Sequence, residues 1–165
     1  MHLVFCPRCA TRLDLDPPGR CPACGTEYWA NPKPCSGALV ERDGAVLLVR
    51  RAIEPGFGRW DLPGGFCEAA EHPEDTARRE LLEETGLDVE LVGLVGMWMD
   101  VYGDGDDPEI TLNLYYRAVP VSARAEVRLS EEASDAAWFR RDELPSDLAF
   151  QHVRDALGAW RALPA

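Results

Sequence analysis

The sequence lacks the long apolar segments, the basic surface and the export signal that several classes of protein require. Its longest apolar runs, 45–49 and 91–99, fall well short of the about 20 residues that cross a bilayer. The net charge is −12, so the electrostatic field repels phosphate backbones. The first residues carry no basic segment of the kind that opens a secretory signal. We therefore expect a cytoplasmic protein with no membrane span, and nucleic acid is disfavoured as a partner.

The 165 residues suffice for one ordinary domain and a small appendage. Beyond residue 35, β-rich runs alternate with two helical patterns, an order typical of α/β layered domains. Asp43-Gly44 separates the first two runs and is a strong hairpin signal. Pro73 suits the first position of a helix, and Gly86 suits the residue beyond its end. We predict strands over 36–41, 45–50, 60–62, 88–101, 110–119 and 137–140, and helices over 73–85 and 148–162.

The predicted helix over 73–85 concentrates carboxylates near its end. At about 100° per residue, Glu80, Glu83 and Glu84 fall within one arc of the helix. Like charges at this spacing repel, and acids in the last turn oppose the helix dipole. An acidic face is often merely solvated, but a hard divalent cation such as Mg²⁺ prefers an oxygen cluster of this kind. The side expected to face a core carries Ala77, Leu81 and Leu82.

The residues that flank this helix favour the metal-binding interpretation. Between residues 65 and 87, glycine, acidic, arginine and apolar residues stand at fixed positions: Gly65, Glu71, Arg79, Glu80, Leu81, Glu83, Glu84, Gly86 and Leu87. In type and spacing they match the Nudix box, and the approach over 58–64 is similar to the family's usual lead-in. The chain therefore resembles the Nudix hydrolases over roughly residues 36–160. The resemblance implies an α/β/α sandwich built around a mixed sheet.

The resemblance also implies a role for each residue of the box. The family's Mg²⁺ (or Mn²⁺) ligands stand at the positions of the three helix glutamates, and a backbone carbonyl near Gly64 or Gly65 often joins them. Glu71 and Arg79 would pair and hold the loop against the helix, as outer residues do around a metal. The metal would bridge phosphate oxygens and orient the attacking water, so no covalent nucleophile is needed. The expected substrate is a small nucleotide, cut at its pyrophosphate bond.

The general base of this reaction stays open at the level of the sequence. Family members often draw a further glutamate from outside the box, and Glu109, Glu131 and Glu132 are the candidates here. Each of these acids is alternatively a solvated loop residue. Glu80 itself could serve as the base instead of a metal ligand.

Substrate contacts are also open. Arg51 and Arg59, ahead of Arg50, are candidates for phosphate contacts, because a guanidinium matches phosphate geometry. The alternative is ordinary surface charge. Trp98 and Tyr102 are candidates to stack a nucleobase, the alternative being core packing.

The beginning of the chain holds a second candidate metal site. Two Cys-x-x-Cys pairs, Cys6 with Cys9 and Cys21 with Cys24, have the form of two zinc knuckles. Four thiolates close the coordination shell, so Zn²⁺ would be structural, and its binding would fold a segment too short for a core of its own. Disulfides are the alternative. The segment resembles the zinc ribbon ahead of some Nudix domains. We expect a zinc ribbon over 1–30, a proline-rich linker over 31–35 and a Nudix domain over 36–165.

Relatives with such a ribbon hydrolyse dinucleotide cofactors. The expected substrate is a nucleoside diphosphate linked to X, with ADP-ribose, FAD or NAD(H) foremost and AMP released. The Ser-Gln-Pro-Trp signature of the NADH branch is absent, since the equivalent stretch 93–100 reads GLVGMWMD. A non-catalytic sensor of ADP-ribose or a similar nucleotide, and an enzyme for nucleotide-capped RNA, are the rival hypotheses. Nudix domains often dimerise, which makes a homodimer a further expectation.

Overall fold

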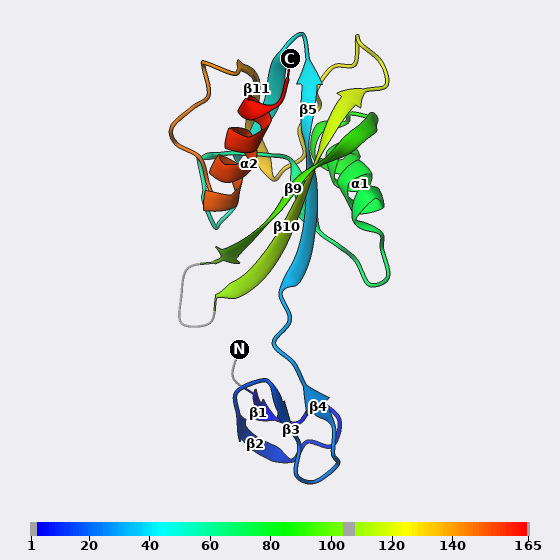
Figure 1. Ribbon diagram of the computed structural model, residues 1–165, viewed down its shortest axis with the longest axis vertical. Helices are drawn as coiled ribbons and strands as arrows, with labels where there is room; N and C mark the ends of the chain where they lie inside the picture. The colour runs from blue at the N-terminus through cyan, green and yellow to red at the C-terminus, as the bar shows by residue number, and fades with distance from the viewer. Residues whose placement is uncertain (1–2, 104–107, 165) are drawn as a thin grey trace.

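The computed structural model describes residues 3–103 and 108–164. Figure 1 shows a small N-terminal body of short strands, joined by an extended segment to a larger body of sheet and helices. The small body contains β1 (Leu3–Phe5) paired with β2 (Arg12–Leu15), and β3 (Gly19–Arg20) paired with β4 (Glu27–Tyr28). Its buried centre is Cys6, Leu13 and Cys21, so thiols supply most of what this body buries.

The larger body is built on a mixed seven-stranded sheet with the main order β11-β6-β5-β10-β9. β5 runs parallel to β10 and antiparallel to β6, and β10 runs antiparallel to β9. Two short strands complete the sheet, β7 beside β6 and β8 beside β5. The strands are β5 (Lys33–Arg42), β6 (Ala45–Arg51), β7 (Trp60–Asp61), β8 (Gly64–Phe66), β9 (Val89–Tyr102), β10 (Glu109–Pro120) and β11 (Ala133–Arg140).

Helices α1 (Pro73–Thr85) and α2 (Gln151–Ala162) cover opposite faces of the sheet, as Figure 1 shows. Side-chain alternation along the strands supplies both cores. On β6, Leu47 packs with the α1 residues, whereas Val46 and Leu48 pack with the α2 residues. On β10, Tyr115 faces α2 and its neighbour Tyr116 faces α1. The predicted α/β/α sandwich with a mixed sheet is confirmed.

Helix α1 has the predicted bounds. Pro73 stands in its first turn, and Gly86 ends it in the left-handed conformation with φ 67°. One prediction on this helix is wrong: Leu82 does not face the core but is 55% exposed, because Ala77 and Leu81 already fill the contact with the sheet.

Helix α2 begins at Gln151, three residues later than predicted. Leu148 is buried, but it forms an isolated bridge with Trp60 of β7 and so belongs to the approach to the helix. At the other end of the domain, β5 begins at Lys33 and pairs there with β10, so the sheet takes in part of the expected linker. No helix within residues 3–103 and 108–164 has the length and apolarity needed to cross a membrane.

Candidate active site

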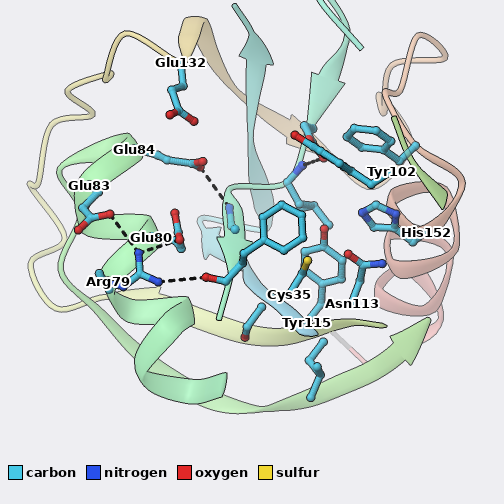
Figure 2. A pocket seen from close by; sticks show the side chains of 18 of the residues that line it. Cys35, Arg79, Glu80, Glu83, Glu84, Tyr102, Asn113, Tyr115, Glu132 and His152 are labelled. Carbon is cyan, nitrogen blue, oxygen red and sulfur yellow. Dashed lines mark hydrogen bonds and ion pairs between the residues drawn. The ribbon is translucent and has the colours of Figure 1, made fainter. Parts of the chain in front are cut away.

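The carboxylates of α1 border a cavity of about 390 Å³ between the helix, the sheet and the approach to α2 (Figure 2). One half of its lining is acidic and the other half is aromatic. The acidic half includes Asp61, Glu68, Glu80, Glu83, Glu84 and Glu132. The aromatic half includes Phe66, Tyr102, Tyr115, Phe150 and His152. Such a cavity suits a ligand with a charged part and a flat part.

Arg79 organises the acidic half. Its guanidinium donates two hydrogen bonds of 2.9 Å to the two carboxylate oxygens of Glu71, and a third of 3.2 Å to the carbonyl oxygen of Phe66. It also reaches Glu80 at 2.7 Å and Glu83 at 3.2 Å (Figure 2). Hydrogen bonds from Arg79, the Glu68 amide and a threonine hydroxyl lower the pKa of Glu71 to about 2. The residues expected to tie the loop to the helix therefore lie in direct contact.

Two glycines bring backbone against these carboxylates. The amide of Gly64 donates to Glu84 Oε2 at 3.1 Å. A side chain on Gly65 would place its Cβ 2.5 Å from the Glu80 carboxylate, and one on Gly64, where φ is 155°, would meet Gly37 at 2.6 Å. Only glycine fits this approach of β8 to β5 and α1.

The acidic half carries more negative charge than its own cations balance. Burial, reinforced by the charges of Glu80, Asp61 and Glu132, raises the pKa of Glu84 to about 8. Burial also raises the pKa of Glu80. A divalent cation would relieve this repulsion, and oxygen donors are the ligands that Mg²⁺ and Mn²⁺ prefer. The donor set therefore fits such an ion.

The glutamate oxygens are held apart in this structure. Among the described residues, the cysteines of the small body are the one group of three or more metal-binding side chains whose ligand atoms all lie within 4.8 Å of one another. Arg79 holds Glu80 and Glu83, while the Gly64 amide holds Glu84. Coordination of one ion by all three would require rotation of these side chains.

The candidates for the general base are separated by the fold. Glu132 lines the cavity, and its charge acts on both Glu80 and Glu84. Glu109 is outside the cavity lining and pairs with Lys33, because the first residues of β10 and β5 lie side by side. Glu131 is exposed and is also outside the lining.

The candidate substrate contacts are separated in the same way. Arg51 and Tyr102 line the cavity, and Arg51 pairs with Asp61 at 2.9 Å and lies over the Phe150 ring. Arg59 lines a different, smaller hollow. Trp98 packs against the α2 core and is outside the cavity lining, because its strand position directs the indole toward Tyr115. Arg50 stacks on Trp60 and donates to the Gly58 carbonyl, so surface structure occupies it.

Sequence reasoning missed several residues of the aromatic half, namely Asp61, Asp100, Asn113, Phe150 and the role of His152. Asn113 stands in the middle of an apolar strand, and a buried polar residue there was the one available signal. The others meet only through the fold, since Asp100 lies on β9 and contacts His152 on α2.

The four clustered cysteines of the small body form a separate site. They are free thiols, and the sulfur of Cys6 lies 3.6 Å from that of Cys24, while Cys9 and Cys21 are 3.8 Å apart. A tetrahedral zinc site with bonds of about 2.3 Å places its sulfurs about 3.8 Å apart. Burial would raise the pKa of the Cys6 thiol, but the Tyr28 hydroxyl and nearby amides lower it to about 6. The cluster is compatible with structural zinc.

Comparison with known proteins places the cavity in a family. A model of the NUDIX domain matches residues 32–160. The nucleoside triphosphatase NudI of Escherichia fergusonii is 38% identical over 120 residues, which are 67% of this chain and 81% of that protein. NudI of Escherichia coli O139:H28 is 35% identical over 114 residues, 64% of this chain and 80% of that protein.

Solved structures agree with the sequence matches. The crystal structure of a NUDIX hydrolase from Nitrosomonas europaea superposes with a TM-score of 0.78 and 30% identity, covering 95% of this chain and 89% of that one. A MutT NUDIX hydrolase from Burkholderia pseudomallei gives a TM-score of 0.69 and 31% identity, covering 78% of this chain and 98% of that one. These matches define a pyrophosphohydrolase. The chain belongs to the Nudix family.

Proposed function

We propose that the protein hydrolyses the pyrophosphate bond of a nucleoside diphosphate linked to X, and that it releases AMP and phosphorylated X. The observation that supports this proposal is the division of one cavity into an acidic half on α1 and an aromatic half by α2. A diphosphate group with its cation suits the first half, and a nucleoside suits the second. ADP-ribose, FAD and NAD(H) are the foremost candidates.

In this proposal Glu80, Glu83 and Glu84 hold Mg²⁺ or Mn²⁺, which supplies charge neutralisation and a polarised water when bound. Arg79 holds two of these carboxylates beside the substrate, and Glu71 fixes Arg79. Glu132 accepts the proton as water attacks one phosphorus and the bond from that phosphorus to the bridging oxygen breaks. The bridging oxygen leaves with the second phosphate.

A second candidate substrate is a nucleoside triphosphate, because the curated relatives are nucleoside triphosphatases. A nucleoside triphosphate and a diphosphate joined to X present the same phosphate chain to the acidic half. They differ in whether a bulky group follows the second phosphate.

Product analysis by liquid chromatography tests both candidates. Zinc-loaded protein with Mg²⁺ is offered ADP-ribose, FAD, NADH, NAD⁺, nucleoside triphosphates and NAD-capped RNA, with a Mg²⁺-free control. We expect Mg²⁺-dependent AMP from a dinucleotide, and loss of turnover in Glu83→Gln with Glu84→Gln. Unchanged turnover in that double variant would refute the metal assignment. Ligand-induced stabilisation with no turnover would favour the sensor hypothesis instead, and turnover confined to the capped RNA would favour the RNA hypothesis.

We also propose that residues 1–30 form a ribbon held by structural Zn²⁺ on Cys6, Cys9, Cys21 and Cys24, and that residues 36–165 form the catalytic domain. A homodimer is part of the same proposal. The edge strand β9 exposes Met97, Met99 and Val101, and exposed apolar edges often mark protein contacts. Metal analysis tests the zinc, and light scattering at several protein concentrations tests the dimer.

A further inference from the structure

The aromatic half of the cavity has flat walls that hold one another in place. The His152 ring stacks on Phe150 with centroids 5.2 Å apart and on Tyr115 with centroids 5.8 Å apart. Tyr102 lies 5.8 Å from Phe150 and 5.4 Å from Phe66. Walls of this kind favour a planar ligand, because aromatic rings pack best face to face or edge to face.

Asn113 presents a hydrogen-bond acceptor to this half. Its Nδ2 donates to the Trp98 carbonyl oxygen at 3.3 Å and to Thr111 Oγ1 at 2.9 Å. A carbonyl oxygen only accepts, so the amide nitrogen must face Trp98, and both of its hydrogens are used. The side chain is buried yet lines the cavity, and no donor among the described residues reaches Oδ1. Oδ1 is therefore an acceptor left for a ligand.

His152 presents a second acceptor. Asp100 Oδ2 accepts from the backbone amide of His152 at 2.9 Å and contacts its Nδ1 at 2.7 Å. A carboxylate accepts, so Nδ1 carries the hydrogen, and Nε2 of the neutral ring is an acceptor. The side chain is buried, it lines the cavity, and Nε2 has no protein partner among the described residues.

Both acceptors depend on Asp100. Its carboxylate fixes His152, while its backbone oxygen accepts from Thr111 Oγ1 at 3.3 Å, and that hydroxyl accepts from Asn113. Figure 2 shows Asn113 and His152 side by side next to Tyr115. Because Asp100 and Thr111 are paired on β9 and β10, the two acceptors share one rigid support.

We propose that this part of the cavity, lined by Tyr102, Asn113, Phe150 and His152, selects a nucleobase that carries an exocyclic amino group. The inference rests on the proposed function, which places a nucleoside here. Two acceptors match the two hydrogens of one amino group. A deaminated base such as hypoxanthine or uracil turns a carbonyl oxygen toward them instead, and that oxygen leaves buried acceptors unpaired.

The test compares bases that differ only in this group. At pH 8.5, kcat/KM is measured for ATP against ITP, CTP against UTP, and ADP-ribose against its hypoxanthine analogue. We expect the amino base to be favoured at least about tenfold, since an unpaired buried polar group costs about 1–3 kcal/mol. Calorimetric binding of AMP against IMP, which needs no turnover, gives an independent reading.

Two variants separate the acceptors from general packing. His152→Phe combined with Asp100→Asn keeps the stacked ring and removes an acceptor, and Thr111→Val releases the Asn113 amide to rotate. We expect each to reduce the preference for the amino base about tenfold through KM, with kcat on the deaminated base unchanged. Asp155→Asn, on the exposed side of α2, is the matched control and should keep the preference.

The outcomes are distinguishable from a failure of the proposed function. Equal turnover of both bases by the wild-type protein refutes the base selection and leaves the hydrolase intact. A preference that survives both variants also refutes it. If no substrate is turned over, the proposed function fails, and tighter binding of AMP than of IMP, lost in the variants, still supports the base selection. Equal binding of the two refutes it.

Discussion

Replacement of Glu84 by glutamine should remove most of the pH dependence of folding in the Mg²⁺-free protein. Burial and the charges of Glu80, Asp61 and Glu132 raise the pKa of Glu84 from 4.5 to about 8. A carboxyl with a raised pKa stabilises the fold fully below pH 4.5, and that stability is lost as the pH rises through about 8. The full shift corresponds to at most about 5 kcal/mol, and sharing of charge among the neighbours reduces the expected loss to about 2–5 kcal/mol.

Urea unfolding at pH 5.5 and pH 8.5 measures this loss directly. The protein must be zinc-loaded and free of Mg²⁺, without a chelator that would strip the cysteine site. We expect the wild-type protein to be less stable at pH 8.5, Glu84→Gln to show a much smaller difference, and added Mg²⁺ to restore the wild-type protein at pH 8.5. Glu90→Gln, an exposed change on β9, is the matched control. A wild-type stability that does not change with pH, or a slope retained in Glu84→Gln, would refute the reasoning.

Three further changes test other parts of the site. Gly65→Ala should lower kcat about 100-fold while the free energy of unfolding changes by less than about 1 kcal/mol, because its Cβ displaces only the mobile end of Glu80; kinetics and urea unfolding together check this. Glu71→Gln should weaken the apparent Mg²⁺ affinity about 10–100-fold, measured by titrating the metal in the activity assay. Arg51→Met leaves Asp61 buried without its partner, and should lower the free energy of unfolding by about 3–5 kcal/mol at neutral pH.

Local sequence signals fixed much of the fold. Helix α1 begins at Pro73 and ends before Gly86, where proline and glycine favour those positions for their own backbone reasons. The hairpin between β5 and β6 likewise turns at Asp43-Gly44, where both residues adopt positive φ. The short strand β8 could not be predicted, because its glycines carry no β preference and are placed by pairing with Ser36 and Gly37 of β5.

The candidate site divides along the same line. Glu80, Glu83 and Glu84 share one helix, so their spacing in the sequence determines their common face. Glu109 and Glu132 looked equivalent in the sequence, and only the pairing of β10 with β5 draws Glu109 to Lys33 and away from the cavity. An acid in a loop carries no local information about the residue it will meet.

This division explains why the reaction can be predicted from the sequence while the substrate cannot. Phosphate chemistry needs carboxylates at helical spacing, and a single element of secondary structure supplies them. Recognition of the base depends on Asn113, His152 and Asp100, which come from β10, α2 and β9 and are joined only by tertiary hydrogen bonds. A change at any of the three can alter the preferred base without disturbing the helix that carries out hydrolysis. Nudix domains with the same box can therefore differ in substrate, and the residues that decide it lie outside the box.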